Sequence, residues 1–142
     1  MRNVVMALLV LVGPASVVHA EQMQWAGCTA NLLEGYHDQP RPCIDCTIGE
    51  IVGPKVAIQY YDSNFVSFLD PHGPDILWLQ EPHMAGDWRV QFALRSTKDG
   101  EVLEMVMGGR TGFSRSSFTA PVKDKEDVAE VLLTVSQFAC HR

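Results

Sequence analysis

The residues with the clearest chemical potential are four cysteines, two of which lie in the tetrapeptide Cys43-Ile44-Asp45-Cys46. This spacing is typical of thiol–disulfide oxidoreductases, in which a strand precedes the pair and a helix follows it, so that the helix N-terminus stabilises the first thiolate. Here Gln39-Pro40-Arg41-Pro42 precedes the pair, and Gly49, Gly53 and Pro54 follow it, where a helix would have to run. The surroundings therefore favour a structural disulfide, and a redox site is the alternative.

Metal binding is the second chemistry that these residue types suggest. The candidate zinc ligands are two cysteines and two histidines: His37, Cys43, Cys46 and His141. The candidate copper ligands are either His83 and Met84 or the pair Met105 and Met107. The zinc set matches no compact zinc motif, and cysteines of an exported protein usually oxidise before zinc reaches them. We expect no metal and no other cofactor.

Hydrolytic catalysis would require a placed nucleophile, base and orienting group. The chain contains no nucleophile elbow, no phosphate-binding loop and no His-Glu-x-x-His sequence. His72 and His83 fall in predicted turns, where a solvated histidine is the ordinary case. The sequence therefore favours a non-enzymatic protein.

One region departs from the acidic character of the chain. Between Glu104 and Asp124 there is no carboxylate side chain, although the region contains three basic residues. The candidate partner-binding residues in it are two arginines and two serines: Arg110, Ser114, Arg115 and Ser116. Guanidinium and hydroxyl groups together suit a carboxylate or a phosphate of a protein partner or a glycan. The alternative is an ordinary solvated face, whose arginines pair with carboxylates elsewhere on the fold.

The beginning of the chain has the pattern of a signal peptide. A short cationic start is followed by an apolar run from Val4 to Val12, too short to span a membrane, and Val18-His19-Ala20 is a small-x-small cleavage sequence. We expect residues 1–20 to be removed and the mature, periplasmic or secreted chain to begin at Glu21. A lipoprotein acylated at Cys28 is less favoured, because the bulky Trp25 lies where a lipobox needs a small or aliphatic residue.

The charge of the chain limits its partners. Residues 1–20 contain one arginine and no carboxylate, so their removal leaves 122 residues and changes the net charge from −6 to −7. Nucleic acids and anionic membrane surfaces reward clustered Lys and Arg, so neither is expected as a partner. A chain of this length supports a single domain, which we expect to comprise residues 21–142.

The even number of cysteines in an exported chain predicts two disulfides. We favour a bond from Cys140 to Cys43 or Cys46, with Cys28 bonded to the remaining cysteine, because this pairing ties both ends of the domain to its body. Residues 21–53 contain frequent Gly and Pro, and we expect them to form an irregular segment that these bonds hold in place.

The clearest structural pattern is a hairpin from Trp88 to Gly109. Apolar residues alternate on both sides of a turn that ends at Gly100, and the register that pairs apolar with apolar sets Leu94 opposite Leu103 and Phe92 opposite Met105. This register buries Phe92 and Leu103 and leaves Gln91 and Glu104 exposed.

Six segments have strand patterns: 55–61, 65–69, 76–80, 88–95, 101–107 and 111–119. Residues 124–139 change to helical spacing, with Asp124 as the N-cap; a strand over 131–138 is the alternative. The expected fold is mainly β (α+β), a six-stranded antiparallel meander over 55–119 that forms a curved sheet or small barrel, followed by one C-terminal helix.

These observations predict a non-enzymatic exported binding module. The most natural partner is a protein of the cell envelope, which the domain would inhibit or assist, and no nucleic acid or stable membrane anchor is expected. The alternative function is thiol–disulfide exchange or metal handling by Cys43 and Cys46.

Overall fold

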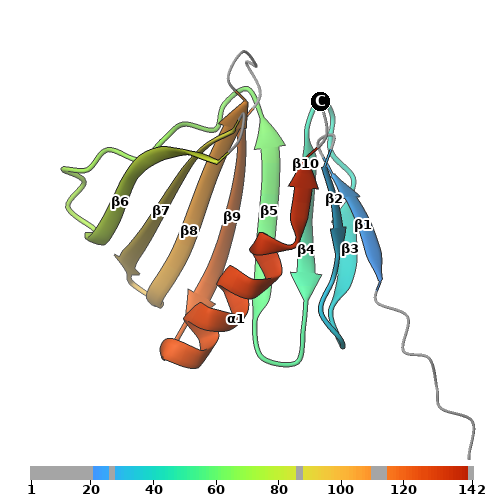
Figure 1. Cartoon of the computed structure of the whole chain (residues 1–142). Helices are drawn as coiled ribbons and strands as arrows, with labels where there is room; N and C mark the ends of the chain where they lie inside the picture. The colour runs from blue at the N-terminus through green and yellow to red at the C-terminus, as the bar shows by residue number, and fades with distance from the viewer. Residues whose placement is uncertain (1–20, 26–27, 86–87, 110–114, 141–142) are drawn as a thin grey trace, which may run out of the picture.

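The computed structural model describes residues 21–25, 28–85, 88–109 and 115–140. Within this part, seven strands form one antiparallel sheet in the order β3-β4-β5-β9-β8-β7-β6, and three form a smaller sheet in the order β1-β2-β10 (Figure 1). The elements are β1 Gln22–Trp25, β2 Cys28–Asn31, β3 His37–Arg41, β4 Thr47–Val52, β5 Ala57–Ser63, β6 Ile76–Ala85, β7 Trp88–Thr97, β8 Gly100–Gly109, β9 Arg115–Val122, α1 Lys125–Ser136 and β10 Phe138–Cys140. The predicted class, mainly antiparallel β with a helix near the C-terminus, is confirmed.

The two faces of the large sheet have different roles. The inner face is the one on which α1 and the smaller sheet pack (Figure 1), and it carries the core residues Ile58, Tyr60 and Phe118. Because side chains alternate along a strand, Gln59 and Tyr61 lie on the opposite, outer face.

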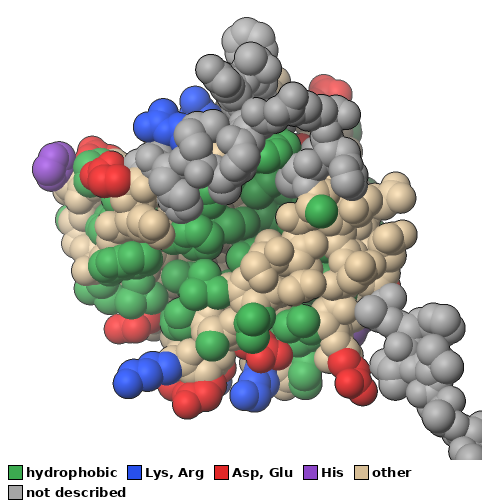
Figure 2. All heavy atoms as spheres, in the orientation of Figure 1, with side chains coloured by type: hydrophobic (Ala, Val, Ile, Leu, Met, Phe, Trp, Pro, Cys, Tyr) green, Lys and Arg blue, Asp and Glu red, His purple; other side chains and the backbone are tan. Residues whose placement is uncertain are grey.

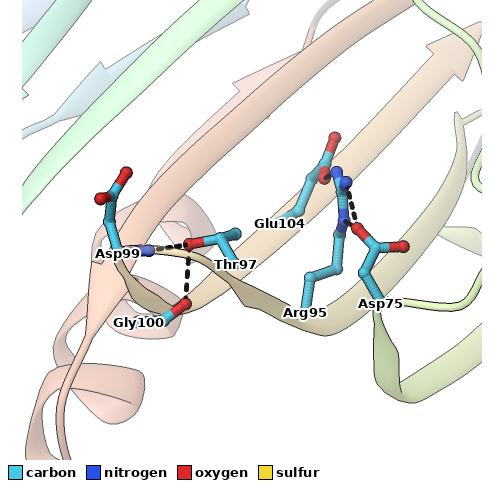
Figure 3. A network of polar contacts seen from close by, with 6 residues as sticks. All are labelled: Asp75, Arg95, Thr97, Asp99, Gly100 and Glu104. Carbon is cyan, nitrogen blue, oxygen red and sulfur yellow. Dashed lines mark hydrogen bonds and ion pairs between the residues drawn. The ribbon is translucent and has the colours of Figure 1, made fainter.

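The predicted hairpin register between β7 and β8 is confirmed, with Leu94 opposite Leu103 and Phe92 opposite Met105. Gly100 closes the turn with φ +125°, a value that side-chain-bearing residues rarely adopt. The Thr97 hydroxyl donates to the Gly100 carbonyl at 2.8 Å and accepts from the Asp99 N–H at 3.2 Å (Figure 3). The turn is therefore fixed by local sequence.

The prediction that residues 21–53 are irregular is wrong, because they contain β1 to β4. These strands have only four to six residues each, which is too short for their alternation to stand out between the glycines and prolines. Pro40 lies on β3, an edge strand of the large sheet, where a missing N–H does not break a ladder on both sides.

The predicted six-stranded meander is also corrected in its order. No described strand covers residues 65–69; instead, the chain leaves β5, passes over the outer face and enters β6 at the far edge. The sheet therefore consists of two meanders, β3-β4-β5 and β6-β7-β8-β9, which join where β5 pairs with β9. We call residues 64–75 the crossing loop.

Gln91 explains why the crossing loop is not a strand. Its side-chain oxygen accepts from the Leu69 N–H at 2.7 Å, and its side-chain nitrogen donates to the Leu69 carbonyl at 3.2 Å. At Leu69, the loop thus obtains both of its backbone partners from a side chain of the outer face and not from a neighbouring strand. Gln91 is only 1% exposed as a result, which contradicts the prediction that it faces solvent.

The helix begins as the sequence predicts, since the Asp124 carboxylate accepts from the Asp127 N–H at 2.9 Å. It ends at Ser136 and not at 139, because Phe138–Cys140 turns back and pairs with β2. This return places Phe138 against Trp25, with ring centroids 5.9 Å apart. The end of the helix thus coincides with the pairing of β10 with β2 and with the packing of the partly buried Phe138 ring against the core.

The core lies between the inner face and its cover. Trp25 contacts Phe118 and Tyr60 edge-on, with ring centroids 4.7 and 5.9 Å apart. The helix contacts β9 and β10, so the half of the inner face formed by β6 to β8 is less covered. Hydrophobic side chains reach the surface there (Figure 2), and Phe92, predicted to be buried, is only partly so.

Candidate binding surface on the outer face

The cysteine pairs differ from those that the sequence analysis favoured. Cys43 bonds to Cys46 within the turn between β3 and β4, where their Cα atoms are 5.4 Å apart. Cys28 is also disulfide-bonded, and the strand register sets it directly opposite Cys140. The expected bond between Cys140 and Cys43 or Cys46 is therefore wrong. The hairpin brings Cys43 and Cys46 within bonding reach of each other, and strand pairing in the smaller sheet aligns Cys28 with Cys140.

The Cys43–Cys46 pair lies in an exposed hairpin turn, in which Ile44 is 91% exposed and Asp45 has a positive φ of 57°. Neither of the flanking elements is a helix, so no helix N-terminus is available to stabilise a thiolate.

The candidate metal ligands are not brought together where the structure describes them. His37 hydrogen-bonds Gln39 at 2.8 Å, and Met105 and Met107 are buried in the core. His141 and the side chains of His83 and Met84 lie outside the described part. Among the described residues, no group of three or more His, Cys, Asp or Glu side chains could hold a metal ion.

The predicted arginine and serine site is only partly described. Arg110 and Ser114 lie outside the described residues. Ser116 belongs to the inner face, is 2% exposed and donates its hydroxyl to Asp62 at 3.2 Å. Arg115, as its neighbour on β9, points to the outer face. The structure therefore does not bring Arg115 and Ser116 to one surface.

Arg115 instead joins a different group on the outer face. Its guanidinium carbon lies 5.1 Å from the ring centroid of Phe68 on the crossing loop, and that of Arg89 lies 4.8 Å from the same ring. Arg115 also donates from Nη1 to the Val66 carbonyl at 3.4 Å. We call Arg89, Arg115 and Phe68 the arginine cluster. Two cations over one ring are each attracted by its electron-rich face.

The arginine cluster differs from the other described arginines in its lack of carboxylate partners. Arg41 pairs with Glu50 at 3.2 Å, and Arg95 lies between Asp75 and Glu104, with Nη1 2.7 Å from Glu104 (Figure 3). The hydrogen bond from Arg95 lowers the pKa of the Asp75 carboxyl. Within the described part, no ion pair joins a carboxylate to Arg89 or Arg115.

A second feature of the outer face is a shallow groove of about 220 Å³ over β3, β4, β5 and β9. We call it the outer-face groove. The side chains that line it from the outer face are Arg41, Ile48, Gln59, Tyr61, Ser117 and Thr119. The register explains their meeting, because Gln59 is opposite Thr119 and Tyr61 is opposite both Ile48 and Ser117.

The polar side chains of the groove are available for hydrogen bonds to a ligand. Gln59, Tyr61, Ser117 and Thr119 have no side-chain hydrogen-bond partner among the described residues. The tyrosines of the inner face differ, since Tyr60 donates to Asp38 at 2.8 Å and Tyr36 donates to Glu130 at 3.0 Å. Burial, followed by these hydrogen bonds to carboxylates, raises the pKa of both phenols.

Sequence reasoning missed both outer-face features. Because side chains alternate along a strand, the sequence from Arg115 to Thr119 indicates that Arg115, Ser117 and Thr119 share a face. This pattern identifies Arg115 of the arginine cluster and two of the groove residues. The remaining residues come from β3, β4, β5, β7 and the crossing loop, and no local pattern indicates where these segments lie relative to β9.

Comparison of the chain with protein-family models, with curated proteins and with solved structures finds no match. In the described part of the chain, no helix has the length and apolar character needed to cross a bilayer.

Proposed function

We propose that this protein is an exported binding module that engages a protein partner through the arginine cluster. The observation that carries the proposal is that Arg89 and Arg115 lie together over Phe68 without a carboxylate partner among the described residues. They do so on a chain with a net charge of −6, where carboxylates are plentiful. Unpaired guanidinium groups that are already held in place suit recognition of carboxylates on another molecule.

The surroundings of the cluster favour a protein over a small anion. Phe65, three residues before Phe68 on the same loop, is 88% exposed. Arginine and the aromatic residues, phenylalanine included, are enriched at protein–protein interfaces relative to the rest of the surface. The expected partner surface therefore combines clustered carboxylates with an apolar site for Phe65. The disulfides of Cys28 and of Cys43–Cys46 support an exported protein, since such bonds persist in oxidising compartments.

The test compares capture of envelope proteins by three immobilised forms of the chain. These are the natural protein, Arg89→Glu with Arg115→Glu, and a control of equal charge change, Lys98→Glu with Lys125→Glu, at two exposed positions. We expect a partner that the natural protein and the control retain and that the arginine variant loses. With that partner purified, the arginine variant should bind at least about a hundredfold more weakly, and natural affinity should fall with added salt.

Thermal denaturation of all three forms separates loss of binding from loss of folding. The proposal would be overturned if the partner still bound a folded variant in which both arginine charges are reversed. The absence of any partner that distinguishes the arginine variant from the control would also overturn it.

The exposed Cys43–Cys46 bond favours one second candidate, a protein that exchanges or handles thiols. Exposed disulfides exchange more readily than buried ones, although the turn lacks the helix that lowers a thiol pKa in oxidoreductases. Equilibration with glutathione decides between the candidates. A reduction potential below about −300 mV identifies a structural bond, and a potential near those of oxidoreductases, roughly −120 to −270 mV, supports exchange.

A further inference from the structure

The outer-face groove uses different residues from the arginine cluster and carries a separate inference. We propose that it is a saccharide site, which holds one neutral pyranose unit of a glycan against the Tyr61 ring.

The space beside Tyr61 arises from the sizes of its neighbours. On the outer face, Tyr61 lies between Ile48 on β4 and Ser117 on β9. Serine is much smaller than tyrosine, and both side chains line the groove. An aromatic ring that lines an open groove offers a flat apolar surface on which the C–H groups of a pyranose can pack.

The polar groups around this ring suit sugar hydroxyls. Gln59 supplies an amide donor and an acceptor, and Ser117 and Thr119 supply hydroxyls that can do either. None of the three has a side-chain partner among the described residues, so binding would not have to break an existing bond. Sugar hydroxyls are also donors and acceptors at once, and a ring with several of them can satisfy this mixed set.

The charges favour a neutral ligand. Arg41 is the groove's one cationic side chain among the described residues, and it is paired with Glu50 at 3.2 Å. The local net charge is therefore close to zero, and a carboxylate or phosphate would also face Glu50. This separates the groove from the arginine cluster, where the guanidinium groups have no described carboxylate partner.

The backbone around the groove argues against an extended peptide. A peptide that adds to a sheet needs an edge strand with free N–H and C=O groups. Tyr61, Gln59, Ser117 and Thr119 lie on β5 and β9, which pair with strands on both sides. At these four residues, recognition must therefore use side chains alone. The volume of about 220 Å³ is below the usual range for drug-sized ligands, roughly 300–1,000 Å³, and suits a single ring.

The experiment is a titration of the full mature chain with sugars and a control peptide, in which binding is measured by the shifts of its amide NMR signals. The neutral probes are maltose, cellobiose and N,N′-diacetylchitobiose; glucuronic acid tests a charged sugar, and acetyl-tetraalanine-amide tests a peptide. We expect at least one disaccharide to shift the Gln59, Tyr61 and Thr119 signals saturably, with a Kd on the order of 1 mM, as is usual for a small open site.

Two variants locate the site. Tyr61→Ala removes the ring and should weaken binding at least tenfold, and Ser117→Leu fills the groove and should abolish binding. Ser96→Leu makes the same exchange at an exposed position on β7, outside the groove, and should bind as the natural protein does. Circular dichroism checks the folding of each variant, and Ser117→Leu still tests the site if Tyr61→Ala does not fold.

The proposal is overturned if none of the disaccharides gives a saturable shift at about 20 mM, roughly twenty times the expected Kd. It is also overturned if the shifts persist in folded Ser117→Leu, or if only glucuronic acid or the peptide binds. Arg89→Glu with Arg115→Glu should leave saccharide binding unchanged. Failure of this site is therefore distinguishable from failure of the proposed protein-binding function.

Discussion

Replacement of Gln91 by methionine should destabilise the protein more than is usual for a residue on the outer face of the sheet. Methionine has nearly the same shape as glutamine, so little cavity is created. The exchange removes both hydrogen bonds to the Leu69 backbone, at 2.7 and 3.2 Å. It therefore tests whether one side chain holds the crossing loop on the sheet.

The magnitude follows from these two bonds. Each contributes about 1 kcal/mol net, and the Leu69 N–H and C=O would lose their partner in a half-buried loop, at a further cost of up to about 1 kcal/mol each. The free energy of unfolding should fall by about 2 to 4 kcal/mol. A loosened loop would also uncover Ala93 and Val106, which are outer-face residues that are fully buried.

Urea unfolding measures the cost, and amide hydrogen exchange locates it. The Leu69 N–H should exchange slowly in the natural protein and rapidly in Gln91→Met. Gln59→Met is the matched control, since Gln59 is exposed on the same face without a described partner, and it should change stability by less than about 0.5 kcal/mol. Equal costs for the two exchanges, with Leu69 still protected, would refute the assigned role of Gln91.

Three further outcomes are expected. Gly49→Ala places a Cβ 2.1 Å from the Tyr60 hydroxyl oxygen, so it should cost about 1 to 3 kcal/mol, and thermal denaturation should show a smaller cost in a Tyr60→Leu background. Because Arg95 lowers the pKa of Asp75, the stability that this pair provides is present above the unfolded pKa, about 3.9, and is lost as pH falls through the folded pKa; carboxyl-detected NMR should show the Asp75 pKa rise in Arg95→Met. The exposed Cys43–Cys46 bond should be reduced before the other disulfide, as alkylation and mass spectrometry would show, and its short loop predicts a loss of only about 2 kcal/mol when both cysteines are serine.

The sequence alone determines those features that depend on neighbouring residues. The hairpin register could be predicted because side chains alternate with a period of two and because Gly100 accepts a positive φ. The start of the helix could be predicted because Asp124 caps the N–H of Asp127, three residues later. Both are local interactions that the folded protein reinforces.

The sequence also shows which residue types lie along β9, but it does not show which residues of other segments lie beside them. The region without carboxylates predicted an arginine site, and Arg115 does lie in the arginine cluster. Its companions there are Arg89 and Phe68, which are 26 and 47 residues earlier in the chain. Ser116, the predicted companion, points to the inner face and bonds Asp62.

Only the tertiary structure decides which surfaces are covered and which strands meet. Gln91 has the pattern of an exposed residue, yet the crossing loop buries it, because the chain between β5 and β6 must pass over the outer face to reach the far edge. The same crossing allows β9 to pair with β5, and that pairing places Ser117 beside Tyr61 and forms the outer-face groove. The cysteine bonds follow the same rule, since four cysteines allow three pairings and only the positions of the strands select among them. Interactions between distant segments depend on the path of the whole chain, which alternation and capping patterns do not contain.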